Sequence, residues 1–376
     1  MSAALTGDLD AIVSCYTKAP ARILLTAVLV KTYIPSIDIR KPFKEKKKGK
    51  EKKKKGELNL FVKGSEDDSY SGRSYDEDFI TDFIYVNKLN LIKTTGFLTP
   101  AFRAKGGVLT PDTELNGKPA NIYRIVLNII NAVHVGDVGA DEVLLEMLRL
   151  LILQRNRNKE EIDSKLQKLK QVEAGSFIPL SSEHIIKLIS GQFDISGASR
   201  LPVLLIAAAY SSVEGKLGEK VMALNAHNAA DSQTGSLGDV EVTMCTDDNI
   251  VTVYEMKLKR VLETDIQGAL VKLIDKPHVD NYIFITTDPI DPVVQDAARD
   301  LYNTYGTEFV ILDCIGFMRH FLHLFHRHRI DFLDAYQQLI LDEPLSDVPQ
   351  EQKELWLAAR IAAESRNNQE YARRQA

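Results

Sequence analysis

The second half of the chain alternates between strand-like and helical hydrophobic patterns. Apolar residues recur with period two in "GDVEVTMC" (238–245) and "NIVTVYEMKLKRV" (249–261), which predicts two strands joined by the turn "TDDN". A long apolar helix is predicted before them, over 201–227, and an amphipathic helix after them, over 263–276. The strand 281–287, the helix 291–306 and the strand 308–314 complete the pattern. This order predicts an α/β (α+β) fold with a mixed β-sheet core flanked by helices.

The first half has a mostly helical pattern. Apolar residues recur at helical spacing over 116–136, 140–156 and 159–172, with short Gly or Asn breaks between these segments. A looser stretch, "EAGSFIPLSS" (173–182), marks a domain boundary. We therefore predict a mostly helical region over 1–180, a core domain over 181–345 and a helical tail over 346–376.

Composition narrows the class of protein. With 44% hydrophobic residues, a chain of 376 residues can bury a large core. The three cysteines are far apart and form no CxxC pair, which favours a reducing compartment over a disulfide framework or zinc knuckle. The N-terminus is acidic, unlike a signal peptide, and the apolar run 21–30 is too short to span a bilayer. We expect a cytoplasmic protein that does not associate with membranes.

The net charge of −5 is unevenly distributed. Residues 40–57 contain 11 Lys or Arg and 3 Glu, a local charge of +8, so the rest of the chain carries −13. Such a lysine run is typical of a solvated insertion, and the alternative is an arm that touches phosphates without reading sequence.

Charged residues interrupt the apolar pattern at one end of the predicted hairpin. Side chains alternate along a strand, so Glu255 and Lys257 point to the same side, about 7 Å apart. Counting back from the turn places Asp239 opposite residues 255–257, where cross-strand neighbours are about 5 Å apart. Two carboxylates and an ammonium group are therefore expected to converge.

Two carboxylates that lie close together both stay ionised when a cation lies between them. Oxygen ligands favour a hard ion, and Mg²⁺ above all, because it takes few protein ligands and keeps several waters. Glu241 lies on the same side as Asp239 and is a further possible ligand. Lys257 can orient or deprotonate a water and stabilise charge on a phosphate. The alternative is a salt bridge between Glu255 and Lys257 at an exposed strand end.

Asp239 followed by Glu255-Met256-Lys257 resembles the signature of the PD-(D/E)XK nuclease superfamily, with Gly238 where a proline is usual. The segments "HNAADSQTGSLGDVEV" (227–242) and "SGRSYDEDFITDFI…TTGFLTPAFR" (71–103) look like type II restriction endonucleases of the SacI-like family. The resemblance covers roughly residues 65–340. It implies a restriction-endonuclease-like fold and Mg²⁺-dependent hydrolysis of DNA.

The resemblance also assigns roles to residues. Asp239 and Glu255 correspond to the metal ligands and Lys257 to the catalytic lysine. Members of the superfamily often add a glutamate from the preceding helix, for which Glu214 and Glu219 are both candidates. Gln267 faces the site if its helix packs behind the hairpin, and otherwise it is a polar position at the edge of an amphipathic helix.

Candidate DNA contacts lie on both sides of this motif. Ser236 belongs to a glycine-rich loop whose backbone can approach a phosphate, or which simply leads into the strand. Lys259 and Arg260 continue the catalytic strand. Arg73 and Arg103 can make bidentate contacts with guanine, or pair with nearby acids. The family resemblance places sequence recognition in the helical first half.

The predicted function is Mg²⁺-dependent, sequence-specific cleavage of double-stranded DNA by a type II restriction endonuclease. Cutting both strands needs two active sites, which a homodimer on a palindromic site provides. A cognate DNA methyltransferase would protect the host genome. The alternatives are a repair or junction-resolving nuclease and a non-catalytic DNA-binding protein with the same fold.

Overall fold

The chain forms two compact units, Met1–Lys159 and Glu160–Ala376. The computed structural model describes residues 2–42, 69–91, 108–114, 118–175, 178–224, 236–274 and 279–375. Most of the lysine-rich insertion lies outside the described residues. The division between the units falls within helix α7 (Ala140–Ala174), whereas the hydrophobic pattern placed a boundary at 173–182.

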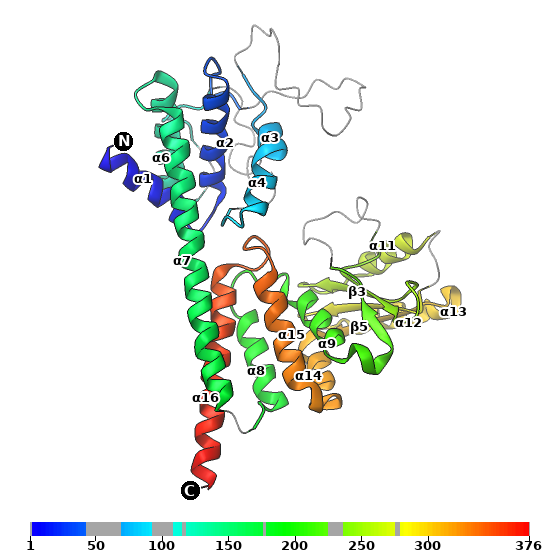
Figure 1. The fold of residues 1–376 in the computed structure, drawn as a ribbon. Helices are drawn as coiled ribbons and strands as arrows, with labels where there is room; N and C mark the ends of the chain where they lie inside the picture. Colours follow the sequence, from blue (N-terminus) through cyan, green and yellow to red (C-terminus); the bar gives the residue numbers. More distant parts are fainter. Residues whose placement is uncertain are drawn as a thin grey trace. The chain divides into compact units, whose positions relative to one another are not determined.

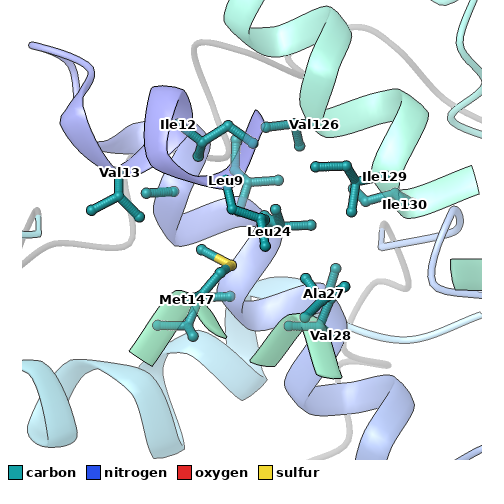
Figure 2. Close-up of a cluster of buried hydrophobic side chains, with 14 of the residues drawn as sticks. Leu9, Ile12, Val13, Leu24, Ala27, Val28, Val126, Ile129, Ile130 and Met147 are labelled. Atoms are coloured by element: carbon teal, nitrogen blue, oxygen red, sulfur yellow. The ribbon is translucent and has the colours of Figure 1, made fainter. Parts of the chain in front are cut away.

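The first unit is built from helices around one apolar core. Its elements are α1 (Ala3–Ser14), α2 (Ala19–Tyr33), α3 (Gly72–Tyr75), the π-helical turn η1 (Asp76–Ile80), α4 (Thr81–Val86), α6 (Ala120–Val135) and the first part of α7. Figure 2 shows side chains from α1, α2, α6 and α7 meeting in this core. Among the described residues, no helix is both long enough and apolar enough to cross a membrane.

A buried ion pair explains the arginine inside the apolar segment 21–30. The Nε of Arg22 donates to Oδ1 of Asp76 at 2.6 Å, and its Nη2 donates to Oδ2 at 2.9 Å. Both side chains are 0% exposed. Burial raises the pKa of Asp76, although Arg22 acts in the opposite direction. The bidentate contact therefore joins α2 to the turn η1 through charges that have no access to water.

The second unit contains a five-stranded sheet with strand order β1–β2–β3–β4–β5. The pairs β1–β2 and β2–β3 are antiparallel, and the pairs β3–β4 and β4–β5 are parallel. The strands are β1 (Glu219–Val221), β2 (Val240–Met244), β3 (Ile250–Lys257), β4 (Asn281–Thr286) and β5 (Glu308–Asp313). The prediction of a mixed α/β sheet, with a hairpin turn near 246–249, is confirmed.

Helices cover both faces of this sheet (Figure 1). One face packs on α9 (Leu201–Leu217) and α14 (Cys314–Leu324). Behind these helices lie α8 (Ser182–Phe193), α15 (Arg329–Asp342) and α16 (Gln350–Gln375), which share the same apolar core. The other face packs on α11 (Glu263–Leu273) and α12 (Pro292–Asp300). The short α13 (Tyr302–Tyr305) follows α12, and the turn η3 (His326–His328) joins α14 to α15. Val253 and Tyr254 alternate between the two cores, as the period-two pattern requires.

The start of β1 corrects the predicted length of the helix before it. The helix expected over 201–227 ends at Leu217, because Gly218 adopts a left-handed conformation with φ 74° and stops it. The chain then enters β1, in which Glu219 pairs with Met244 of β2. Glu219 therefore lies on a strand and not on the preceding helix.

The C-terminal helix is part of the second unit. Trp356 and Leu357 of α16 are fully buried in the core that also includes α8, α9 and α15. Arg360 of the same helix donates to Glu173 at 2.7 Å and to Asp334 at 2.8 Å. The segment predicted as a separate tail over 346–376 thus completes the core of the α/β unit.

Candidate active site

Asp239 lies beside β3 at the open end of the hairpin. Its backbone N–H donates to the carbonyl of Tyr254 at 2.8 Å, and Val240 pairs with Tyr254 in the strand register. The Oδ2 of Asp239 accepts from the backbone N–H of Met256 at 2.7 Å. Asp239 is therefore opposite Glu255, within the range predicted from the turn.

Glu255 and Lys257 point to the same side of β3. The Lys257 Nζ lies 3.1 Å from Oε1 of Glu255. β3 is the central strand and lies between β2 and β4. Lys257 pairs with Thr286 of β4, and Thr286 pairs with Asp313 of β5. The carboxyl ends of the parallel strands thus meet at the edge that carries the site, which is where open α/β sheets bind ligands.

Three further side chains, which the sequence patterns did not reveal, complete this cluster. Lys272 of α11 lies 3.0 Å from Oε2 of Glu255, and Asp265 of α11 lies 3.4 Å from the Nζ of Lys257. Tyr282 of β4 donates to Oε2 of Glu255 at 3.2 Å. The two oxygens of Glu255 therefore each accept from an ammonium group, and one also accepts from a buried hydroxyl.

The electrostatics of the cluster oppose the full ionisation of Asp239. Burial raises the pKa of its carboxyl group, and the Glu255 carboxylate adds to this rise. The Met256 N–H and the ammonium groups of Lys272 and Lys257 act in the opposite direction without cancelling it. A cation beside the two acids would remove this conflict.

Lys257 stays protonated in this environment. Burial by itself would lower its pKa, but the carboxylates of Glu255 and Asp265 outweigh burial and raise the pKa above its ordinary value. In this state the lysine can stabilise negative charge but cannot accept a proton at neutral pH. Of the roles predicted for Lys257, the raised pKa is compatible with orienting a water and stabilising charge, but not with deprotonating the water.

Gln267 does not face the cluster. It is exposed on α11, whose buried side carries Ile266 and Ala269. Asp265 and Lys272 lie two turns apart on the helix and both reach the cluster. The helix does pack against β3 through Ile266 and Ala269, but Gln267 takes the alternative position at its polar edge, and other side chains of the helix reach the cluster.

The two candidate helix glutamates lie away from Asp239. Glu214 is exposed on α9, and α9 packs on the other face of the sheet. The Glu219 carboxylate lies near the hydroxyls of Tyr210 and Tyr254, where it adds to the burial that raises their pKa values. Tyr254 faces the α9 side, so Glu219 is on the side of the sheet opposite to Glu255.

Glu241 holds the loop that precedes β2. Its Oε1 accepts from the Ser236 hydroxyl at 3.0 Å and from the backbone N–H of Leu237 at 2.6 Å. The Ser236 hydroxyl also lies 2.7 Å from the carbonyl of Gly238, so its one hydrogen is shared between the two acceptors. Both residues, predicted as a metal ligand and a DNA contact, are engaged in shaping the approach to Asp239.

The remaining candidate DNA contacts are exposed or lie outside the described residues. Lys259 and Arg260 follow β3 at the surface, and the Arg260 guanidinium is 3.7 Å from Asp291. Arg73 of the first unit pairs with Glu77 at 2.7 Å, the alternative that the sequence left open. Arg103 lies outside the described residues.

The donor set fits a hard cation with few protein ligands. Within the described ranges, no three His, Cys, Asp or Glu side chains form a group that could hold a metal ion. Asp239 and Glu255 offer a pair of carboxylates, and Mg²⁺ is commonly held by one or two carboxylates with water filling the other positions. Burial is the main cause of the raised pKa of Asp239, and the two lysines of the cluster only partly offset it.

Comparisons with family models and with curated proteins do not assign the chain to a family. No family model matches the chain, and no curated protein matches it significantly.

Proposed function

We propose that this chain is a metal-dependent phosphodiesterase whose active site is the Asp239–Glu255–Lys257 cluster. The observation that carries the proposal is the meeting of two carboxylates and a protonated lysine at the carboxyl end of the central strand. Asp239 and Glu255 would hold a divalent cation, which supplies an activated water and screens the charge of the phosphate.

The side chains of the cluster have separable tasks in this reaction. Lys257, charged at neutral pH, stabilises the negative charge that grows on the phosphate as the bond to the leaving oxygen breaks. The Tyr282 hydroxyl lies 3.2 Å from Oε2 of Glu255 and 2.9 Å from the carbonyl of Leu237, so its one hydrogen is shared between them and ties the carboxylate to the loop before β2. These contacts fix the positions of the acids before substrate binds.

Within this class, the proposed protein is a type II restriction endonuclease that hydrolyses double-stranded DNA at a short site. The resemblance of segments 71–103 and 227–242 to such enzymes supports this step. So does the exposed basic pair Lys259–Arg260, which continues the active-site strand. Homodimerisation, a cognate methyltransferase and a cytoplasmic location follow from the same proposal.

Incubation of the protein with plasmid DNA and Mg²⁺ tests both steps. Discrete fragments from the wild type and from Lys187→Ala, but none from Lys257→Ala, are expected, because Lys187 is an exposed lysine of α8 on the other face of the sheet. Degradation without discrete fragments would favour a repair or junction-resolving nuclease. Binding of DNA without cleavage would favour the non-catalytic alternative, and equal cleavage by Lys257→Ala would refute the assigned role of the lysine.

A further inference from the structure

Asp265 connects the first turn of α11 to the cluster through both of its carboxylate oxygens. Its Oδ2 accepts from the backbone N–H of Leu262, the residue before the helix, at 2.9 Å. Its Oδ1 lies 3.4 Å from the Nζ of Lys257. Because the first oxygen is bound to the backbone of its own turn, the second has a defined position beside the lysine.

The ammonium group of Lys257 needs such an anchor. A lysine side chain is a flexible four-carbon stem, so β3 sets the direction of the side chain but not the position of its Nζ. The side chain is 29% exposed, and two carboxylates contact its Nζ: Glu255 at 3.1 Å and Asp265 at 3.4 Å. One carboxylate lies on β3 and the other on α11, so the ammonium is held from two elements.

The two carboxylates differ in their other tasks. Glu255 is a proposed metal ligand, and an oxygen of Glu255 that binds a cation attracts the ammonium less strongly, because the two positive charges repel each other. Within the part of the chain that the structure describes, no three acids, histidines or cysteines form a group that could hold a metal ion. Asp265 therefore does not join Asp239 and Glu255 as a third ligand.

We propose that Asp265 is the positioning residue of Lys257 and holds its ammonium group in place when Glu255 binds the metal. The proposal rests on the proposed function and adds a residue to it. Asp265 acts through the lysine and not on the substrate. Since Lys257 stabilises charge that develops as the phosphate bond breaks, loss of its anchor should slow cleavage without weakening the binding of DNA.

A double-mutant cycle tests the contact without metal or DNA. Asp265→Asn removes the charge but keeps an oxygen for the N–H of Leu262, and urea unfolding of the metal-free full chain is followed by the fluorescence of Trp356. The substitution is expected to lower the urea midpoint by about 0.2 M in the wild type and to have no effect in Lys257→Met, where its partner is absent. An equal change in both backgrounds would show that Asp265 only caps the helix, and would refute the proposal.

Plasmid cleavage in MgCl₂ at saturating DNA tests the consequence. Asp265→Asn is expected to cleave about tenfold more slowly, with unchanged DNA and MgCl₂ concentrations for half of its maximal rate. Asp265→Glu restores a carboxylate at a helix position where glutamate is a common cap, and it should keep most of the wild-type rate. Glu263→Gln removes an exposed acid from the same turn of α11 and controls for the change in net charge.

The possible failures are distinguishable. A wild-type rate in Asp265→Asn would overturn the positioning role and leave the nuclease proposal intact. A slow rate that excess MgCl₂ restores would make Asp265 a metal ligand, which also contradicts the proposal. Absence of cleavage by the wild type would overturn the proposed function together with the catalytic role of Asp265, whereas the cycle would still decide whether Asp265 holds Lys257.

Discussion

Gly238 precedes the first acid of the site, and the structure explains why this position has no side chain. A Cβ built on Gly238 would lie 2.5 Å from Cγ1 of Val253 and 2.8 Å from the carbonyl oxygen of Tyr254. That oxygen accepts the N–H of Asp239. The substitution Gly238→Ala therefore forces a methyl group into the hydrogen bond that positions the acid on β3.

The expected cost follows from these distances. The contact with the carbonyl oxygen is 0.6 Å shorter than the 3.4 Å at which ordinary contacts begin, and a backbone atom cannot rotate away. Overpacking of this kind costs about 1–3 kcal/mol of unfolding free energy. A shift of this size in Asp239 would also reduce cleavage about tenfold, because positional errors of about 1 Å cost up to about a hundredfold.

Urea unfolding followed by tryptophan fluorescence measures the first effect. Trp356 is the only tryptophan of the chain and is fully buried in the second unit, so it reports on the unit that contains Gly238. Gly215→Ala is the matched control, since a Cβ on this exposed glycine of α9 would meet no atom within 4 Å. The control is expected to stabilise the helix by about 0.5–1 kcal/mol.

The two alanine variants should therefore move the urea midpoint in opposite directions. An unchanged or higher midpoint for Gly238→Ala would refute the argument, because the strand edge would then have room for the methyl group. A loss of cleavage in Gly215→Ala equal to that in Gly238→Ala would show that the activity effect is not local.

Three other changes test the charges and hydrogen bonds. The pKa of Asp239 is higher in the folded protein than in the unfolded chain, so the wild type loses stability as pH rises through the folded pKa. At pH 7 in EDTA, Asp239→Asn should therefore be the more stable protein in urea unfolding. The difference should vanish below about pH 3.9, where Asp239 is protonated in both states. A pH-independent difference would contradict this. Tyr282→Phe leaves the carbonyl of Leu237 without its donor, and this should lower the unfolding free energy, measured by tryptophan fluorescence, by about 1–2 kcal/mol. An unchanged unfolding free energy would mean that water replaces the hydroxyl. Arg22→Met leaves Asp76 buried without its charged partner, and this should lower the unfolding free energy of the first unit, followed by circular dichroism, by about 3–5 kcal/mol. A loss below about 1 kcal/mol would show that Asp76 is neutral.

The hairpin and its acids were predictable because the information is local. A period of two places Glu255 and Lys257 on one side whatever the rest of the fold does, and the turn at 246–249 sets the register of Asp239 to within two residues. The strand β1 was not predictable from its pattern. It has three residues, too few to show alternation, and only Gly218 marked the end of the helix before it.

The contributions of α11 and β4 depend on packing across the sheet. Ile266 and Ala269 are the buried residues of α11, so they determine which side of the helix faces the sheet. Residues at the edge of that side can reach the site, whereas Gln267 is polar but lies on the exposed side. Lys272 follows Ala269 by three residues and so lies on the buried side. Tyr282, inside an apolar strand, needed a partner for its hydroxyl, but the sequence does not say which one.

The alternation of β3 between two cores has an evolutionary consequence. Val253, Glu255 and Lys257 lie on the α11 side, and Tyr254 lies on the α9 side. A single-codon insertion or deletion within β3, before Glu255, would turn the acid and the lysine toward the α9 core and the tyrosine toward the site. Homologous genes should therefore vary in length at the loops that flank β3 and keep an invariant residue count within it.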